Sequence, residues 1–237
     1  MTNKTLSRFL PFFDPNELPS YPFIFMASSR RSGKSTVICD LILNYWHDQY
    51  DFIIGVMGNP HSCRQYTAVG AIPEKYCHSQ YKPEILKEWF AKSDELLRKG
   101  KTLPSTLFIC DDILQLNKTK DHRTTRSDPY LNKLATTGRH YNAGCVLIVQ
   151  SWNVGLPFIR QSDAVIVSPT SLYAGSDYRR LAEDYMTGDN VKQNKEILEM
   201  FGQYDFLVLR YWKATRSQKK LLSYYRVNAQ SLSFSKH

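Results

Sequence analysis

The sequence FIFMASSRRSGKST, residues 23–36, determines the fold that we expect for this chain. A short apolar run leads into a polar loop, and the apolar residues of the following stretch, 34–48, recur with helical spacing. The loop fits the pattern GxxxxGK[ST], except that Ser28 stands where the pattern has its first glycine. We therefore predict a strand, a phosphate-binding loop and a helix, in this order.

The chemistry of such a loop assigns a role to its residues. Backbone N–H groups of the loop and of the first helical turn converge on phosphate oxygens. Gly33 lets the backbone come close, the Lys34 ammonium reaches the β- and γ-phosphates, and the Ser35 hydroxyl ligates Mg²⁺. The predicted nucleotide-binding residues are Ser28, Ser29, Arg30, Arg31, Ser32, Gly33, Lys34, Ser35 and Thr36.

Length and composition favour one large α/β domain with a basic surface. The chain has 237 residues, of which 42% are hydrophobic, and 31 basic against 22 acidic residues give a formal charge of +9. This excess indicates a polyanionic partner such as nucleic acid, or simply a solubilising surface. Residues 1–22 hold four prolines and are predicted to form an extended arm, followed by a single domain over residues 23–237.

The five cysteines form no CxxC pair. Cys39, Cys110 and Cys145 lie in apolar runs and are expected in the core, which is typical of a protein from a reducing compartment. A zinc site remains an alternative for the other two, because Cys and His are zinc ligands, although the spacing matches no metal motif. Its candidate ligands are His61, Cys63, Cys77 and His78.

We expect a soluble intracellular protein. No apolar run approaches the ~18 residues that a membrane-spanning helix needs. The apolar residues near the N-terminus are interrupted by Arg8 and Pro11, which is atypical of a signal peptide.

Strands that alternate with helices predict an α/β fold with a mainly parallel sheet and right-handed connections. The predicted strands are 23–27, 52–57, 106–110, 145–149 and 164–167, with an antiparallel pair at 206–212 and 221–227. The predicted helices are 34–48, 84–98, 129–141, 176–187 and 190–201, and residues 59–82 are predicted to be irregular. We expect the strand 52–57 to lie between the loop strand and the strand 106–110.

Polar residues follow three of these strands, where ligands bind in parallel sheets. The phosphate loop follows the first, Asp111 and Asp112 follow the third, and Gln150 follows the fourth. Asp111 is the expected partner of Mg²⁺ opposite Ser35. We expect Asp112 to orient or deprotonate the attacking water, and Gln150 to sense the γ-phosphate or to hold that water.

Several stretches together resemble the genome-packaging ATPases of poxviruses and other large double-stranded DNA viruses, within the FtsK/HerA superfamily of P-loop NTPases. They are SSRRSGKS (28–35), NPHS (59–62), IPEKY (72–76), LFICDD (107–112), GRHY (138–141), VLIVQS (146–151), LPFIR (156–160) and FLVLRYW (206–212). The phosphate loop and the GRHY–VLIVQS pair are the most specific of these. The chain differs from the pattern at Ser28, and at Asp112, where cellular members usually carry Glu.

The resemblance implies a RecA/FtsK-like P-loop NTPase fold, with an extra strand between the loop strand and the Asp-Asp strand. It implies ATP and Mg²⁺ as cofactors and a homo-oligomeric ring, a pentamer or hexamer, that pushes double-stranded DNA of any sequence into a preformed capsid. Capsid or portal-vertex proteins would be further partners. The expected location is the host cytoplasm, in a virus factory, or the virion.

The resemblance also implies an arginine that stabilises negative charge on the transferring phosphoryl group. Arg160 in LPFIR is the preferred candidate, donated to the neighbouring subunit, and Arg139 in GRHY is the alternative. Contacts with the DNA backbone are expected from the basic loop 117–127, unless that loop is only solvated. Its basic residues are Lys118, Lys120, Arg123 and Arg126, and a second cluster comprises Arg210, Lys213, Arg216, Lys219 and Lys220.

Two other functions also fit the sequence. A terminase-like motor would share the paired Arg30 and Arg31 of the loop, but it normally carries a nuclease domain, for which there is no room after residue 170. A nucleotide-dependent switch with weak hydrolysis is the other alternative. Four residues argue against such a switch: Lys34, Asp111, Asp112 and Gln150.

Overall fold

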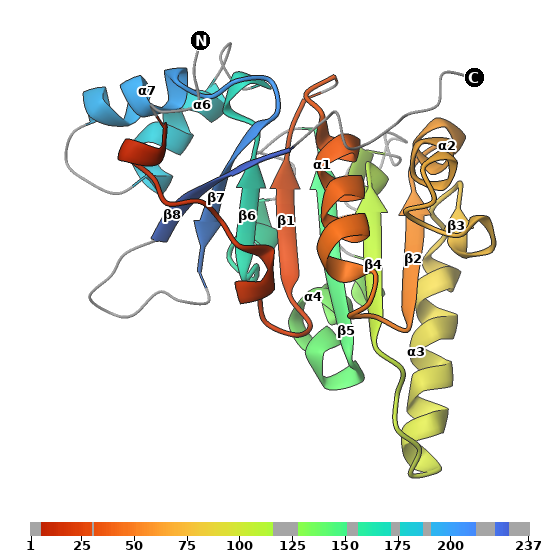
Figure 1. Cartoon of the computed structure of the whole chain (residues 1–237). Coiled ribbons are helices and arrows are strands. Elements are labelled where there is room, and N and C mark those ends of the chain that lie inside the picture. The colour runs from red at the N-terminus through yellow and green to blue at the C-terminus, as the bar shows by residue number, and fades with distance from the viewer. Residues whose placement is uncertain are drawn as a thin grey trace, which may run out of the picture.

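An eight-stranded sheet runs through the middle of the protein (Figure 1). The computed structural model describes residues 6–29, 31–115, 128–150, 156–171, 176–186, 191–211 and 221–227. The strand order is β3-β2-β4-β5-β1-β6-β7-β8. The strands are β1 Phe23–Ala27, β2 Phe52–Met57, β3 Cys77–His78, β4 Thr106–Asp111, β5 Ala143–Val149, β6 Ala164–Val167, β7 Asp205–Arg210 and β8 Leu221–Arg226.

The pairing of the strands confirms the predicted α/β class. The strands from β3 to β6 in this order pair in parallel, whereas β7 pairs antiparallel with both β6 and β8. The parallel strands therefore end at one common edge of the sheet, which is the upper edge in Figure 1. The predicted C-terminal antiparallel pair is present as β7 and β8.

The extra strand between the loop strand and the Asp-Asp strand is β5. It pairs with β1 on one side and with β4 on the other, so that Phe23 faces Cys145 and Asp111 faces Ile148. The prediction that residues 52–57 take this place was wrong, because they lie between the two strands along the chain but not in the sheet. β2 pairs with the far side of β4.

Helices cover both faces of the sheet and make three layers. One face carries α1 Lys34–Leu41, its π-helical continuation Ile42–Trp46, and α2 Pro60–Ala68. The other face carries α3 Pro83–Arg98, α4 Pro129–Thr137, α5 Leu156–Ile159, α6 Ser176–Arg180 with the π-helical turn Leu181–Tyr185, and α7 Val191–Glu199. The short 3-10 turns are Leu6–Arg8, Pro15–Glu17, Glu74–Tyr76, Ile113–Gln115, Gly138–Tyr141 and Pro169–Ser171.

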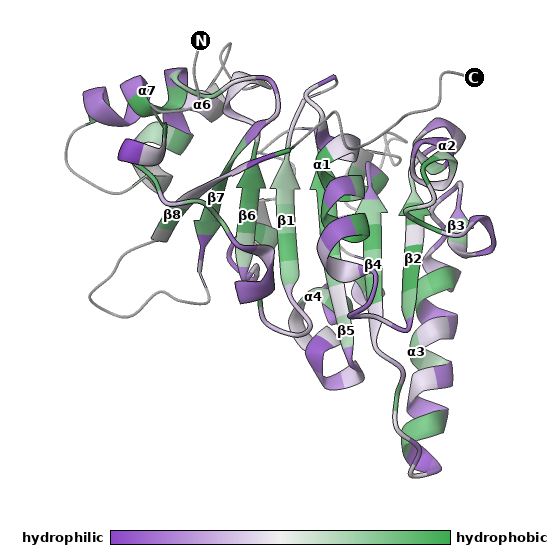
Figure 2. Cartoon of the chain, in the orientation of Figure 1, coloured by the Kyte–Doolittle hydropathy of each residue, from purple (hydrophilic) through white to green (hydrophobic). Residues whose placement is uncertain are grey.

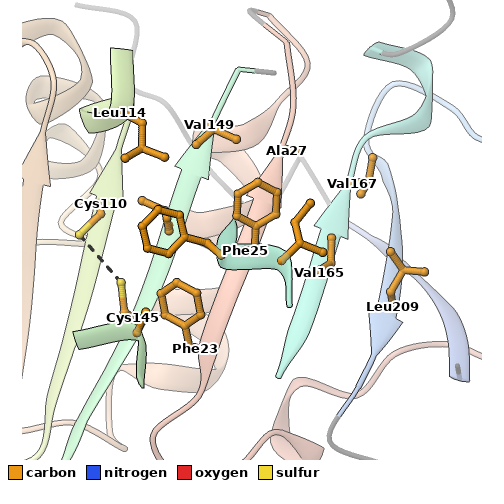
Figure 3. Packing of buried hydrophobic residues seen from close by; sticks show 14 of the residues in the cluster. Phe23, Phe25, Ala27, Cys110, Leu114, Cys145, Val149, Val165, Val167 and Leu209 are labelled. Atoms are coloured by element: carbon orange, nitrogen blue, oxygen red, sulfur yellow. Dashed lines mark hydrogen bonds between the residues drawn. The ribbon is translucent and has the colours of Figure 1, made fainter. Parts of the chain in front are cut away.

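Alternating side chains of β1 divide the core between the two faces. Ile24 and Met26 pack with α1, whereas Phe23 and Phe25 pack with the helices of the opposite face. Figure 3 shows the two phenylalanines among side chains of β5 and β6. All of β1 is buried, as expected for a strand covered on both sides. Figure 2 shows the hydrophobic strands between the two layers of helices, whose outer faces carry polar residues.

The core cysteines confirm one prediction. Cys39, Cys110 and Cys145 are buried and free, and the sulfurs of Cys110 and Cys145 lie 3.9 Å apart on adjacent strands (Figure 3).

Within the described ranges, no helix has the length and apolarity to cross a membrane.

Helix α2 lies in a stretch that we predicted to be irregular, so that prediction was wrong. The Asn59 side chain caps the helix by accepting a hydrogen bond from the Ser62 N–H at 2.9 Å, and Pro60 occupies its first turn. The Asn-Pro pair is a helix-start signal, but the Tyr, His and Pro content around it hid the helical spacing.

The described part of the N-terminal arm packs on the edge of the sheet. The Phe13 N–H donates to the Tyr224 carbonyl at 2.8 Å, and the Tyr224 N–H donates to the Pro11 carbonyl at 3.0 Å. Phe13 is buried, and the Phe12 ring meets Tyr224 edge-on with centroids 5.6 Å apart. The arm therefore covers part of the outer edge of β8.

Candidate functional site

A pocket of about 590 Å³ opens at the carboxyl ends of the parallel strands. It brings together three of the predicted signals, the phosphate loop, Asp112 and Gln150, and adds side chains from α2 and from the turn before β7. Its lining residues are Arg31, Gly33, Lys34, Ser35, Thr36, Asn59, His61, Ser62, Gln65, Asp112, Gln150, Gln203 and Tyr204.

The loop after β1 is closed on itself by serine side chains. The hydroxyls of Ser28 and Ser32 are hydrogen-bonded to each other, and Ser32 also donates to the Ser29 carbonyl at 2.8 Å. Positive φ occurs in the loop at Arg31 (63°) and Gly33 (86°), whereas Ser28 is not among the described residues with positive φ. The first bend therefore does not need the glycine that Ser28 replaces. Arg30 lies outside the described residues.

Lys34 connects the loop to the acidic pair. Gly33 is the N-cap of α1 and Lys34 is the first residue of the helix. The Lys34 ammonium lies 2.9 Å from Asp112 Oδ2 and 3.3 Å from Asp111 Oδ1, and its side chain is only 12% exposed. An ammonium in this position lies beside the converging N–H groups of the loop, where it adds to their attraction for phosphate.

Asp111 is fully buried at the end of β4. Burial raises the pKa of its carboxyl group, and the neighbouring Lys34 ammonium offsets this only in part. The Tyr66 hydroxyl, from α2, donates to Asp111 Oδ2 at 3.2 Å. Oδ1 has no hydrogen-bond partner among the described residues, although it faces Lys34. A buried carboxylate oxygen with spare acceptor capacity suits a hard cation such as Mg²⁺.

The raised pKa predicts that Asp111→Asn stabilises the protein. When folding raises the pKa of an acid, the folded protein becomes less stable as the pH rises from the unfolded pKa, about 4, through the folded pKa. Asn removes this loss while keeping the shape. We expect a higher midpoint at pH 7 and a flatter pH dependence than in the parent protein; for a chain of this size, each kcal/mol shifts the midpoint by ~2–4 °C.

Thermal unfolding between pH 4 and pH 8 tests this, with Asp48→Asn as the control because that side chain is fully exposed. A lower midpoint for Asp111→Asn at pH 7 would show that its ion pair with Lys34 outweighs its burial. Higher stability combined with lost activity is the behaviour expected of a residue kept for function.

Asp112 is turned towards the loop by an unusual backbone. Its φ is 59°, a left-handed conformation that Asp tolerates better than most residues. A Cβ added at Gly58 would lie 2.6 Å from the Asp112 carbonyl oxygen, so the end of β2 packs directly against this bend. Gln150 Nε2 donates to Asp112 Oδ2 at 2.6 Å, which holds the carboxylate between β4, β5 and the loop.

Helix α2 supplies site residues that we did not predict. The Ser35 hydroxyl donates to Gln65 Oε1 at 2.9 Å, and Gln65 Nε2 lies 3.3 Å from His61 Nε2. With Tyr66 on Asp111, this helix contacts both predicted Mg²⁺ ligands, Ser35 and Asp111. The signal that we missed was the helix start at Asn59-Pro60. A helix that begins there contains Gln65 and Tyr66 in its second turn.

The two candidate arginines lie away from this pocket. Arg139 is in the turn Gly138–Tyr141 before β5, as predicted, at the amino end of the sheet. Arg160 follows α5, three residues before Asp163, whose N–H donates to the Phe23 carbonyl at the start of β1. Both side chains are exposed. Neither is among the residues that line the pocket of its own subunit.

The structure does not assemble the alternative zinc site. Cys63 and Cys77 form a disulfide with Cα atoms 6.0 Å apart, whereas His61 faces Gln65 in the pocket. Over the described part of the chain, no three His, Cys, Asp or Glu side chains are grouped so as to hold a metal ion. The disulfide was not predicted, since its separation of 14 residues follows no motif, and it does not fit the reducing compartment that we expected from the cysteines.

The four basic residues predicted to contact DNA, from Lys118 to Arg126, lie outside the described residues. The same holds for the second basic cluster except Arg210, which pairs with Glu17 at 3.2 Å.

Comparison with known proteins supports the same fold. No protein-family model matches the chain. The uncharacterized protein L437 of Acanthamoeba polyphaga mimivirus is 26% identical over 147 residues, which cover 59% of this chain and 49% of that protein. The matched region thus spans about half the length of this relative.

Among solved structures, the genome packaging NTPase B204 of Sulfolobus turreted icosahedral virus 2 is similar. Its complex with ATP-gammaS shows 18% identity and a TM-score of 0.54, over 87% of this chain and 98% of B204. Its complex with AMPPCP gives 17% identity and 0.55, over 86% and 98%. At this identity the likeness shows a shared fold. It confirms, at the level of the fold, the resemblance to viral genome-packaging ATPases predicted from sequence.

Proposed function

We propose that this chain is an ATPase that moves viral double-stranded DNA into a preformed capsid. The observation that carries the proposal is the meeting of Lys34, Asp112 and Gln150 at one phosphate loop, with hydrogen bonds among them. The fold shared with a viral packaging NTPase supports the same assignment. We further propose that the protein works as a homo-oligomeric ring, because both candidate arginines lie opposite the pocket of their own subunit.

The loop and Lys34 bind the triphosphate in this proposal. Backbone N–H groups around Gly33 and the first turn of α1 face the phosphates, and the Lys34 ammonium neutralises the β- and γ-phosphates. Ser35 and Asp111 are the residues that would hold Mg²⁺, since they provide hydroxyl and carboxylate oxygens of the kind it prefers. The bound ion would supply positive charge next to the phosphoryl group that is transferred.

Asp112 positions and deprotonates the attacking water. Its Oδ2 oxygen is occupied by Gln150 and Lys34, whereas Oδ1 has no hydrogen-bond partner in the part of the chain described. We assign Oδ1 to the water. Gln150 fixes the orientation of the Asp112 carboxylate. In this proposal its amide lies beside the γ-phosphate, so loss of that phosphate can shift Gln150 and, through it, Asp112.

Turnover measured with and without DNA tests the function. A packaging motor should hydrolyse ATP faster when double-stranded DNA of any sequence is added, since the DNA is its substrate for movement. Heparin at equal charge is the control for a general polyanion effect. Hydrolysis that is the same with and without DNA would favour a nucleotide switch over a motor.

Binding to DNA should weaken steeply with salt, because bound cations are released from the phosphates. Neutralising four residues of the basic loop should reduce the slope of log K against log salt by up to about 4, or about 0.9 for each phosphate that the variant no longer neutralises. The four are Lys118, Lys120, Arg123 and Arg126.

The matched control removes four exposed charges from α3 and its end, Lys87, Lys92, Arg98 and Lys99. That control should leave the salt slope nearly unchanged. An unchanged slope in the loop variant would instead assign DNA binding to the cluster between Arg210 and Lys220.

Mixed rings test whether Arg160 acts on the neighbouring subunit. Arg160→Ala and Lys34→Ala should each be inactive alone, since an arginine finger contributes about 10³–10⁵ in rate. Mixing them should restore part of the activity, because some interfaces then combine an intact loop with an intact Arg160. Arg179→Ala, which changes an exposed arginine of α6, should stay active alone. Full activity of Arg160→Ala would transfer the role to Arg139.

A further inference from the structure

The turn before β7 brings an aromatic ring against the phosphate loop. Tyr204 and Gln203 line the pocket, and a Cβ added at Gly33 would lie 3.0 Å from Cδ1 of the Tyr204 ring. Tyr204 is half-buried and Gln203 is exposed. No predicted role in phosphate binding or hydrolysis uses either residue.

This turn is held in place by several bonds. The Gly202 N–H donates to Asp205 Oδ2 at 2.8 Å, and the Asp205 N–H donates back to the Gly202 carbonyl at 3.2 Å. Asp205 is buried and also accepts two hydrogen bonds from the Arg226 guanidinium of β8. The Val227 N–H donates to the Tyr204 carbonyl at 3.1 Å. These bonds therefore fix the backbone that carries the Tyr204 ring beside Gly33.

The order of the strands gives the pocket a direction. The groups that act on the terminal phosphate, Asp112 and Gln150, follow β4 and β5, which lie on one side of β1. Tyr204 precedes β7, on the other side of β1 and β6. A triphosphate whose γ-phosphate faces Asp112 therefore extends its other end towards the turn with Tyr204.

The α2 end of the pocket suits a nucleoside less well. Gln65 is bonded to Ser35, and Asn59 is bonded to Ser62 as a helix cap. These polar groups are already engaged, and Gln65 contacts the predicted Mg²⁺ ligand Ser35. A base needs a flat apolar surface for its face and polar groups for its edge, and the turn before β7 offers both.

We infer that Tyr204 and Gln203 form the nucleoside subsite of this pocket, with the purine base packed on the Tyr204 ring and the Gln203 amide facing its edge. This inference rests on the proposed ATPase function and names the residues that recognise the base. Base–aromatic stacking contributes about 1–3 kcal/mol, which is roughly 5- to 150-fold in affinity.

Calorimetric binding of Mg²⁺-ATP and Mg²⁺-tripolyphosphate separates the base from the phosphates. Tyr204→Leu keeps an apolar side chain against Gly33 but loses the aromatic face, so ATP should bind about 5- to 150-fold more weakly while tripolyphosphate is unaffected. Tyr204→Phe should retain ATP binding. Gln203→Ala should change the ratio of ATP to GTP affinity, and Gln161→Ala, an exposed glutamine at the opposite end of the sheet, should not.

Equal losses for ATP and tripolyphosphate in Tyr204→Leu would show that the ring only supports the loop, and would overturn the subsite. Unchanged ATP binding in Tyr204→Leu would also overturn the subsite. Weaker ATP binding in His61→Ala would then place the base at α2. Wild-type protein that binds neither compound would instead overturn the proposed ATPase function itself.

Discussion

Replacing Lys34 with alanine is expected to lower ATP turnover by about 10²–10³-fold or more. The ammonium lies 2.9 Å from Asp112 Oδ2 and 3.3 Å from Asp111 Oδ1, and Lys34 is the first residue of α1. In the proposed function, its removal takes away charge that would stabilise the β- and γ-phosphates during hydrolysis. Steady-state release of phosphate at saturating ATP measures the effect.

The control is Lys99→Ala, which removes an exposed lysine paired with Glu95 and should turn over ATP like the parent protein. Lys34 also neutralises buried Asp111, so thermal unfolding must show that the Lys34 variant is folded at the assay temperature. A folded Lys34→Ala protein with near-parental turnover would mean that the loop does not bind the reacting phosphates.

Asp112→Asn should separate binding of ATP from its hydrolysis. The amide can still accept from Gln150, and Asn tolerates the left-handed backbone at this position, so we expect an intact site. It cannot take a proton from water, and general-base catalysis contributes typically about 10²–10⁴-fold. Turnover should fall by that factor while ATP affinity, measured by calorimetry, stays within a few fold.

Asp48→Asn, which changes a fully exposed carboxylate, should leave both quantities unchanged. If Asp112→Asn hydrolyses ATP at the parental rate, another group deprotonates the water. A loss of ATP binding that parallels the loss of turnover would instead show that Asp112 supports the loop through Lys34.

The phosphate loop, Asp111, Asp112 and Gln150 could be predicted from the sequence because each follows an apolar strand directly. The carboxyl ends of parallel strands meet at one edge, so a residue's place in the chain is enough to bring these groups together. The order of the strands could not be predicted in the same way. Nothing in the residues of 52–57 indicates that β5, rather than this strand, lies next to β1.

The Asn59-Pro60 helix start could have predicted a helix that contains Gln65 and Tyr66. Their contacts in the site, and those of Tyr204, could not be predicted because they depend on tertiary packing. In the sequence, Tyr66 looks like a residue on the buried side of a helix. Its hydroxyl reaches Asp111 only because α2 packs over β4. Tyr204 lies far from Gly33 in the chain, and the antiparallel return of β7 beside β6 brings the two together. Ser28 shows the reverse case, in which a departure from the motif is accommodated by a local hydrogen bond.

The position of β1 in the sheet also affects how the chain folds on the ribosome. β1 pairs with β5 and β6, whose residues follow it by about 120 and 140 positions in the chain. At synthesis rates of about 5–20 residues per second, the apolar segment 23–27 waits about 6–30 seconds for its partners. By contrast, β2 can pair with β4 much earlier in synthesis. The strand that leads into the phosphate loop thus pairs late, and slower synthesis prolongs the time for which its apolar residues lack their partner strands.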